Sequence, residues 1–273
     1  MPSLFTLVRA LIGITALSSR PSAASLQTVT NWGENPSDIS TMQIYVPDKL
    51  AANPPIILGL HPCGGTGQMY YGMTKLPKYA DSIGFILIYP TTTKETNCRD
   101  CHSNKTLTHE GGGDSQGLVN MVKYALNKYN GDPTKVFAVG GSSGAMMTNV
   151  LAATYPDVFN AGASWSGGPG RLLQWGDIAR GCYPGYSGNR TRMIIAHGTA
   201  DPAVLYSLLG MQLAQWSNVL GVSFSKNMTN TPAQGWTEMI YGDGSKLVGL
   251  SLQGGGHIPR FQEEKVLKFF GLM

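Results

Sequence analysis

Continuous hydrophobic runs alternate along the chain with segments whose apolar residues recur at helical spacing. Three continuous runs predict strands buried on both faces of a sheet: Pro55–His61, Phe85–Pro90 (which its proline ends) and Lys135–Val139. Shorter apolar segments predict four more strands: Met42–Val46, Ala161–Trp165, Met193–His197 and Leu247–Leu252. Helical spacing predicts helices over Met69–Ser82, over Gln116–Tyr129 with Asp114 or Ser115 as its cap, from the 140–144 turn through Leu151, and over Phe261–Phe270. This order predicts one α/β domain with a mostly parallel central sheet and helices on both faces.

The first residues are typical of a secretion signal. Arg9 precedes an apolar stretch, Ala10–Leu17, and Ala24 ends a run of small residues that suits cleavage. The stretch is far shorter than the ~20 residues needed to span a bilayer, so no membrane anchor is expected. A buried first helix is the alternative. We therefore expect a signal over residues 1–24 and a single catalytic domain over 25–273, without a carbohydrate-binding module.

The composition excludes several classes of protein. Only 13% of the residues are charged, the net charge is +4, and no cluster of Lys and Arg concentrates it, which excludes a nucleic-acid-binding surface. The 35 glycines follow no fixed period, which excludes collagen-like and repeat architectures. With 42% hydrophobic residues the chain can bury a large core, which excludes a disordered protein.

Two further features agree with export. Asn104, Asn189 and Asn227 each begin an N-x-Thr triplet, the acceptor pattern for N-glycosylation in a eukaryotic secretory route. The four cysteines are an even number, which suits an oxidising compartment and permits three disulfide connectivities.

The sharpest chemical signal is the G-x-S-x-G pattern at Gly140–Gly144. It follows a predicted core strand and opens a predicted helix, the strand–turn–helix setting of a nucleophile elbow. Ser142 is therefore the candidate nucleophile. A glycine-rich structural turn or a phosphate cradle at a helix start is the alternative. A dinucleotide site is not indicated, because G-x-G-x-x-G and a later acidic partner are both missing.

A serine nucleophile needs a base and an orienting acid, which follow it in the order Ser, Asp or Glu, His on this fold. His257 lies in a glycine-rich turn after a predicted strand, so its ring can reach the elbow. Asp201 lies in the loop after the strand that ends at His197. Ordinary loop positions are the alternative for both residues. Asp177 and Asp243 are competing acids, but neither directly follows a core strand.

The loop after the first buried strand is the candidate source of an oxyanion hole. His61–Gly65 follows that strand, and in α/β hydrolases this loop donates one main-chain N–H beside that of the residue after the nucleophile. The N–H groups of Cys63 and Ser143 are therefore the candidate donors. A simple tight turn is the alternative.

Cys98, Cys101 and His102 admit a different hypothesis, because they form a C-x-x-C-H pattern, which c-type haem attachment uses. A zinc site is a second alternative. Haem attachment needs machinery that the ordinary eukaryotic secretory route lacks, which counts against it.

Six motifs in this order resemble the fungal acetyl xylan esterases of carbohydrate esterase family 1 and their feruloyl esterase relatives. They are HPCGGTG (61–67), TLTHEGGGDS (106–115), GGSSGAMMTNVLAATYPDVF (140–159), CYPGYSG (182–188), HGTAD (197–201) and GGGH (254–257). The resemblance implies a secreted, monomeric α/β-hydrolase that acts on esterified plant cell-wall polysaccharide with no metal or organic cofactor. Its nucleophile, acid and base fall on Ser142, Asp201 and His257.

The chain departs from the family pattern in three places, one of which is that it lacks a cysteine pair that the family often carries between 168 and 182 and has Cys101 and Cys182 elsewhere instead. Arg99 stands where the family has a tryptophan, so a residue that lines the substrate becomes a cation; Trp165 is a second candidate lining residue. The segment between Gly168 and Cys182 is shorter than usual, which implies an altered acceptor pocket. By resemblance Cys63 pairs with Cys98, and Cys101 and Cys182 then remain as the second disulfide.

The function expected from these features is removal of acetyl groups from acetylated xylan by a serine ester hydrolase. Feruloyl esterase is the alternative within the same chemistry. A non-catalytic wall-binding relative, with its acyl site closed, is the alternative from another class.

Overall fold

A single sheet organises the part of the chain that the computed structural model describes, residues 24–92, 97–168 and 176–273. Its central strands run parallel, in the spatial order β4 (Ile86–Thr92), β3 (Ile56–Leu60), β5 (Val136–Gly141), β6 (Ala161–Trp165), β7 (Arg192–Gly198) and β10 (Leu247–Leu252). Antiparallel strands extend both sides: β2 (Ile39–Tyr45) and β1 (Leu26–Val29) beyond β4, and β9 (Trp236–Tyr241) and β8 (Phe224–Thr229) beyond β10. The predicted mostly parallel α/β architecture is confirmed.

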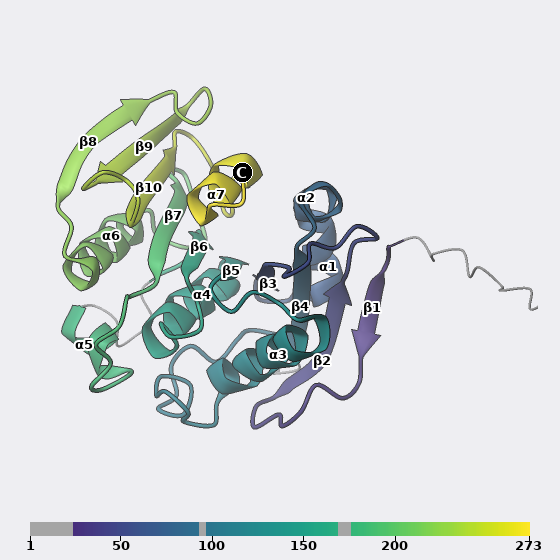
Figure 1. Ribbon diagram of the computed structural model, residues 1–273. Coiled ribbons are helices and arrows are strands. Elements are labelled where there is room, and N and C mark those ends of the chain that lie inside the picture. The colour runs from purple at the N-terminus through teal and green to yellow at the C-terminus, as the bar shows by residue number, and fades with distance from the viewer. Residues whose placement is uncertain (1–23, 93–96, 169–175) are drawn as a thin grey trace, which may run out of the picture.

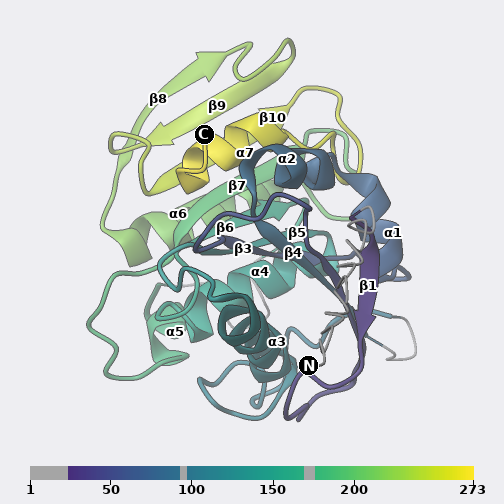
Figure 2. The same ribbon diagram turned by 45° about the vertical axis from the view of Figure 1, so that its right-hand side comes forward.

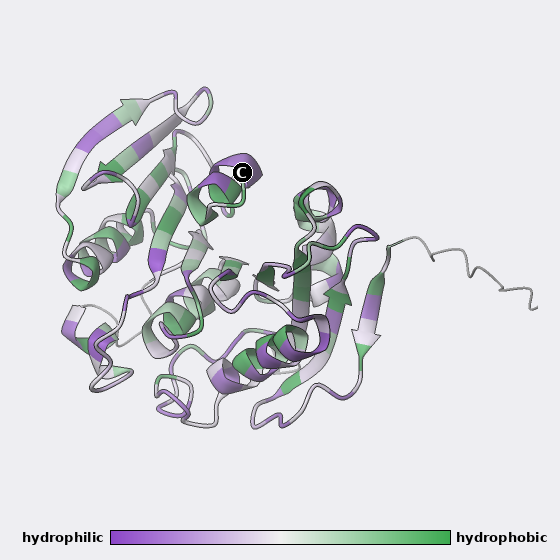
Figure 3. Ribbon diagram, viewed as in Figure 1, coloured by the Kyte–Doolittle hydropathy of each residue, from purple (hydrophilic) through white to green (hydrophobic). Residues whose placement is uncertain are grey.

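Helices cover both faces of this sheet (Figures 1 and 2). One face carries α3 (Asp114–Tyr129), α4 (Ser143–Thr154), α5 (Gly176–Gly181) and α6 (Ser207–Leu220). The other carries α1 (Gly67–Met73), α2 (Leu76–Ile83) and α7 (Glu263–Phe270). The central strands are largely hydrophobic in Figure 3, as two covered faces require.

Strand β3 shows how the sequence produces this layering. All five of its residues are buried, because successive side chains enter different cores. Ile56 and Leu58 pack with α3 and α4, whereas Ile57 packs with α2 and α7. An uninterrupted apolar run is therefore what this position demands.

Several predicted boundaries differ from the structure, and three of them concern a helix break, a strand end and a helix start. The single helix expected over Met69–Ser82 is two helices, α1 and α2, because Thr74 between them is extended and Pro77 lies in the first turn of α2. Pro90 lies within β4 instead of ending it. The helix expected from Gln116 begins at Asp114 with Gly113 as its cap.

Several elements have no counterpart among the sequence predictions: β1, α5, α6, β8 and β9. Strand β8 shows the reason, because all six of its residues are exposed and no buried face imposes an alternating pattern on them. The predicted secretion signal cannot be compared with the structure, since residues 1–23 lie outside the described residues. Residues 169–175, which belong to the shortened segment after Gly168, also lie outside the described residues.

The parallel strands direct their carboxyl ends to one edge of the sheet. β5 ends at Gly141, β6 at Trp165, β7 at Gly198 and β10 at Leu252. The loops that follow these strands therefore meet at that edge, which is where open α/β sheets place their ligand sites. All three predicted catalytic residues follow one of these strand ends.

Candidate active site

Ser142 occupies a sharp turn between β5 and α4. Its backbone has φ 53° and ψ −117°, a conformation that side chains other than glycine rarely adopt. Holding a serine there costs about 1–3 kcal/mol, and such strain persists only where the surrounding structure enforces it. The amide of Ser142 donates to the carbonyl of Trp165, which fixes the turn against β6 (2.9 Å). The turn thus has the geometry of a nucleophile elbow.

The two glycines that flank this turn are required by packing. A Cβ atom on Gly140 would collide with the carbonyl of Gly144. One on Gly144 would collide with the main chain of Leu60 and lie 2.8 Å from the carbonyl oxygen of His61. The elbow and the loop after β3 therefore approach each other backbone to backbone, as the glycine pattern predicts.

Asp201 is buried in the loop after β7 and is held there by its own loop. Its Oδ1 accepts hydrogen bonds from the amides of Ala203 and Val204, both at 2.9 Å. Its Oδ2 lies 2.9 Å from Nδ1 of His257. Burial raises the pKa of Asp201, but hydrogen bonds from Val204, His257, Ala203 and Ser166 outweigh it and lower the pKa to about 2. Asp201 is therefore ionised at neutral pH.

The loops that carry Asp201 and His257 fit together through small residues. A Cβ atom on Gly198 would collide with the carbonyl of Gly255. The amide of Ala200 donates to that same carbonyl at 2.9 Å, and the amide of Gly254 donates to Oγ1 of Thr199 at 2.8 Å. The HGTAD and GGGH motifs thus form one interlocked pair of loops.

The loop of His257 also lies against the elbow. The next residue, Ile258, approaches within 3.1 Å of the place where a Cβ on Gly141 would stand, and Gly141 precedes Ser142. His257 turns Nδ1 toward Asp201, which leaves Nε2 as the ring nitrogen for a nucleophile. No hydrogen bond joins Oγ of Ser142 to His257 in the described part of the chain; catalytic hydrogen bonds are often long before substrate binds. The structure thus joins acid to base and packs the loop of the base against the elbow that carries the serine.

The competing acids lie elsewhere. Asp177 is an exposed residue of α5 paired with Arg180, and Asp243 is an exposed turn residue bonded to Ser245. His197 does reach the site: its Nε2 lies 3.0 Å from the carbonyl of Val204 and 3.2 Å from Oδ2 of Asp201. Its ring is buried, so it supports the acid and does not compete with His257 for the serine.

The loop after β3 is held by the ring of His61. Its Nδ1 lies 2.7 Å from the carbonyl oxygen of Pro62, and its Nε2 lies 3.5 Å from the amide of Thr92. Burial, with the nearby charge of Arg99, lowers the pKa of His61 to about 4, so the ring is neutral. A disulfide between Cys63 and Cys98 ties the loop to the chain after β4, as the resemblance implies.

The candidate oxyanion donors come from these two neighbouring segments. Ser143 is the first residue of α4, where a backbone N–H has no acceptor within the helix. Cys63 lies on the exposed loop that packs against Gly144. The segments are adjacent, which is the arrangement that two donors to one oxygen require.

The second expected disulfide, between Cys101 and Cys182, is not formed. Both side chains are buried thiols. The Cys101 thiol points to the carbonyl of Ser143, and the Cys182 thiol points to the carbonyl of Ile178 in α5. The correction follows from this packing, because the Cys101 sulfur is directed to the start of α4 and the Cys182 sulfur to α5. The haem alternative fails as well, since Cys98 is already bonded to Cys63.

The two expected substrate-lining side chains are both buried. Arg99 is 4% exposed and donates from Nη2 to the carbonyl of Pro90 at 2.9 Å, and its burial lowers its pKa to about 10. Trp165 is fully buried and packs against Phe261, with ring centroids 4.5 Å apart. The lining role expected for both is therefore wrong: one braces β4 and the other forms core behind the elbow.

The three sequon asparagines, Asn104, Asn189 and Asn227, are exposed, as a glycan would require; their glycosylation stays a prediction. Within residues 24–92, 97–168 and 176–273, no helix is long and apolar enough to cross a bilayer. Over the same ranges, His, Cys, Asp and Glu form no cluster of three or more that could hold a metal ion.

Ser166 is a residue of the site that was not predicted from the sequence. Ser166 follows β6, has φ 52°, and accepts a hydrogen bond from the amide of Ile258 at 3.0 Å. A serine after a predicted strand end is the one signal it carries in the sequence, and such serines are common. Only the folded chain shows that it lies between Asp201 and the loop of His257.

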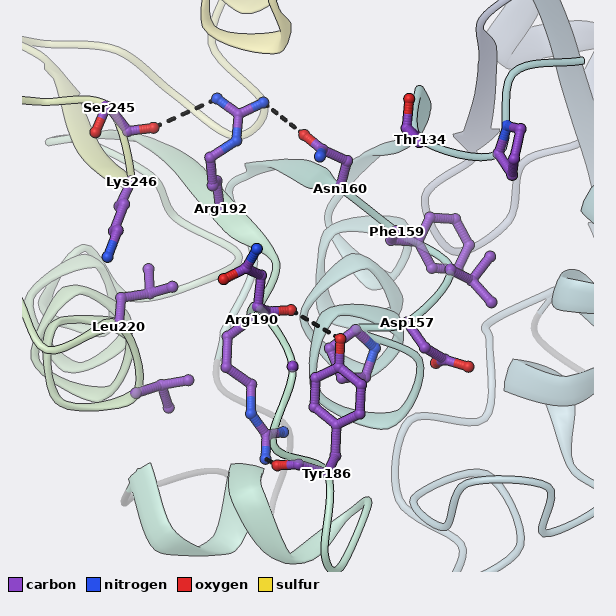
Figure 4. A pocket seen from close by; sticks show the side chains of 16 residues that line it. Thr134, Asp157, Phe159, Asn160, Tyr186, Arg190, Arg192, Leu220, Ser245 and Lys246 are labelled. Carbon is purple, nitrogen blue, oxygen red and sulfur yellow. Dashed lines mark hydrogen bonds between the residues drawn. The ribbon is translucent and has the colours of Figure 1, made fainter.

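A cavity of about 610 Å³ lies at the opposite edge of the sheet (Figure 4). Its lining includes Thr134 before β5, Asn160 before β6, Arg192 at the start of β7 and Lys246 before β10. These positions mark the amino ends of the parallel strands, so the cavity is remote from Ser142 and the loops of Asp201 and His257. Its size does not make it the reactive site.

Comparison with known proteins agrees with this geometry. The family model described as Esterase PHB depolymerase matches residues 39–169. Feruloyl esterase B of Neurospora crassa is 48% identical over 98% of this chain and 99% of its own length. Acetylxylan esterase A of Emericella nidulans is 38% identical over 92% of this chain and 90% of its own length.

A solved structure supports the same relationship. The acetyl xylan esterase of Aspergillus awamori superposes with a TM-score of 0.87 at 38% identity, covering 91% of this chain and all of that one. The similarity therefore extends over nearly the whole chain.

Proposed function

The chain belongs to the family of fungal acetylxylan and feruloyl esterases, and from that premise we propose that it removes acetyl groups from acetylated xylan. It is a carboxylic ester hydrolase. One observation carries the assignment of its reactive centre: a serine in strained backbone, on an elbow that contacts the loop of a histidine whose Nδ1 is held by an ionised aspartate. That arrangement is the one that serine ester hydrolysis requires.

The first half of the reaction forms an acyl-enzyme. Ser142 Oγ attacks the ester carbonyl while Nε2 of His257 takes the serine proton. Asp201 holds the imidazole through Nδ1 and stabilises the positive charge that develops on it. The developing oxyanion lies against the N–H groups of Ser143 and Cys63, and His257 then gives the proton to the departing sugar oxygen, which leaves as the alcohol.

The second half releases the acid. Water replaces the sugar alcohol, His257 accepts a proton from it, and the resulting nucleophile attacks the acyl carbonyl. Collapse of this second intermediate returns the proton to Ser142 Oγ and frees acetate. Because the same two donors serve both intermediates, a rigid oxyanion loop assists both steps. The Cys63–Cys98 disulfide and the His61 ring supply that rigidity.

Feruloyl ester hydrolysis is the second candidate, favoured by the 48% identity to feruloyl esterase B of Neurospora crassa. The catalytic groups serve either ester equally, because both esters pass through an acyl-enzyme on Ser142. The partner in both cases is an esterified cell-wall polysaccharide, and nucleic acid and membrane play no part.

We further infer that the protein is a secreted monomer with one catalytic domain over residues 25–273. The Cys63–Cys98 disulfide supports an oxidising compartment. The exposed positions of Asn104, Asn189 and Asn227 are compatible with glycans added during export. Size-exclusion chromatography with light scattering and mass spectrometry of the protein from a fungal host test these points.

The deciding experiment compares the protein with its Ser142→Ala variant on acetylated xylan and on methyl ferulate, following acetate and ferulate. We expect acetate release that the variant loses by a factor of at least about 10³, with an unchanged circular dichroism spectrum. Release of ferulate alone would agree with the same serine mechanism but would make feruloyl ester hydrolysis, the second candidate, the function.

Two other outcomes contradict the proposal. If the Ser142→Ala variant still releases acetate, Ser142 is not the nucleophile and the proposed mechanism is wrong. No release from either substrate by the folded protein would remove both ester assignments and favour a non-catalytic wall-binding relative.

A further inference from the structure

Three residues other than glycine have left-handed backbone conformations at the same place in the molecule. Ser142 follows β5 with φ 53°, Ser166 follows β6 with φ 52°, and Ile258 follows His257 with φ 53°. They are connected directly: the amide of Ser142 donates to Trp165, the residue before Ser166, and the amide of Ile258 donates to Oγ of Ser166. The strained positions of the nucleophile and the base loop thus meet at Ser166.

The main chain around Ser166 is fixed from two sides. Its amide donates to the carbonyl of Ala196 in β7 at 2.8 Å. The next carbonyl, of Gly167, accepts a hydrogen bond from Nε2 of Gln212 in α6 at 3.0 Å. Gln212 is itself held by Asn149 of α4 through a bond of 2.8 Å. A buried polar network therefore holds Ser166 in its strained conformation.

The hydroxyl of Ser166 is buried, so both its lone pair and its proton need partners. The lone pair accepts the N–H of Ile258, at 3.0 Å. Asp201 is the anionic acceptor beside it, and hydrogen bonding from Ser166 contributes to the low pKa of that carboxyl. One hydroxyl thereby connects the carboxylate of Asp201 to the backbone that carries His257.

We propose that Ser166 is a positioning residue of the catalytic site, whose hydroxyl sets the orientation of the Asp201 carboxylate and of the His257 loop relative to each other. The proposal rests on the function given above. Asp201 and His257 already meet at 2.9 Å and their loops are hydrogen-bonded to each other, but none of these bonds ties the pair to the strands beside the elbow. Ser166 supplies such a tie, because it directly follows β6, the strand next to β5.

A purely structural serine is a poor explanation for this position. Glycine adopts φ near 50° without strain, so a residue that only had to make the turn would be expected to be glycine. The serine retains a strained backbone and a buried hydroxyl. The arrangement is understandable if the hydroxyl itself is needed.

The test is the Ser166→Gly variant, which removes the hydroxyl and relieves the backbone at the same time. We expect kcat on 4-nitrophenyl acetate to fall about 10- to 100-fold with KM within about twofold, and the unfolding temperature to stay level or rise. Asn130→Gly is the matched control, because Asn130 has φ 52° at the exposed end of α3. It should change the unfolding temperature in the same direction and leave kcat unchanged.

A double-mutant cycle with Asp201→Asn separates positioning from a general loss of packing. If Ser166 acts through Asp201, Ser166→Ala lowers kcat in the natural protein but by less than about twofold in the Asp201→Asn background. The acid limb of the kcat/KM profile of Ser166→Ala should also move to higher pH. With one donor fewer, Asp201 stabilises protonated His257 more strongly, while the buried His197 ring on its other side is unchanged.

Equal losses in both backgrounds, or a wild-type kcat in Ser166→Gly, would overturn the inference. Such a result is distinguishable from failure of the proposed function. If the proposed function fails, Ser142→Ala keeps its activity. If only the role of Ser166 fails, Ser142→Ala is inactive and the Ser166 variants keep the kcat of the natural protein.

Discussion

The two edges of the central sheet differ in what they expose. At the carboxyl edge, Ser142, Ser166 and Ile258 have strained backbones, and Asp201 and His257 are in contact. At the amino edge lies the cavity of about 610 Å³, and none of its lining residues has a positive φ.

The polar groups of the two edges are also used differently. At the amino edge Arg192 donates to Asn160 and to the carbonyls of Ser245 and Phe269, so its hydrogen bonds fasten the protein to itself (Figure 4). At the carboxyl edge, Nε2 of His257 and the Ser142 hydroxyl form no hydrogen bond within the described residues, so both remain available to a substrate. In this protein, reactive groups held in strained backbone therefore identify the site better than the volume of a cavity does.

The largest effect is expected from a substitution that disrupts the backbone contacts at the carboxyl edge. Gly144→Ala places a Cβ into the main chain of Leu60 and His61, neither of which can turn aside as a side chain can. We expect a loss of about 3 kcal/mol or more in the free energy of unfolding, or failure to fold, measured by chemical denaturation.

Gly72→Ala is the control for that substitution. Gly72 lies in α1 with nothing within 4 Å of its added Cβ, so the variant should be as stable as the natural protein or gain up to about 1 kcal/mol. Similar losses in both variants would show that close approach at the elbow is not what Gly144 provides.

Acid should weaken the carboxyl edge through Asp201. Its pKa is about 2 in the folded protein, below the value of about 3.9 for an unfolded aspartate, so its ionised form favours folding. This contribution is complete above pH ~4 and is lost as the pH falls to ~2, by about 2 kcal/mol in all. Urea denaturation at several pH values measures it.

Asp201→Asn removes the titrating group and serves as the comparison. The decline in unfolding free energy between pH 4 and 2 should be shallower in this variant by about 2 kcal/mol. Parallel curves for the two proteins would contradict the assignment of a strongly stabilised carboxylate.

The smallest effect is expected at the amino edge. Lys246→Ala removes a cation from the lining of the cavity. The unfolding free energy should change by no more than about 0.5 kcal/mol, and kcat and KM for the ester should stay within twofold. A tenfold change in either kinetic constant would show that the cavity takes part in the reaction and would remove the distinction between the edges.

Local patterns were sufficient for the central architecture. Strands β6 and β10 were predicted with their observed bounds, because a strand covered on both faces must be apolar throughout. Strand β8 was missed, because its exposed residues are under no such constraint. The helix break at Thr74 was missed as well, since apolar spacing continues across it, although Pro77 marks the first turn of a new helix.

At the site, the sequence by itself determined which residues stand at the ends of parallel strands. Ser142, Asp201 and His257 are recognisable because a nucleophile elbow, an acid loop and a histidine loop each have a local pattern of glycines and polar residues. The glycines of the elbow were predictable for the same reason.

Only the tertiary structure decided which of these groups touch and which residues lie inside. It placed Arg99 and Trp165 in the interior, kept Cys101 and Cys182 as separate thiols, and brought Ser166 between the acid and the base loop. These outcomes depend on contacts between segments far apart in the chain. A residue's neighbours in sequence constrain its backbone, but its partners in space are chosen by how whole layers pack.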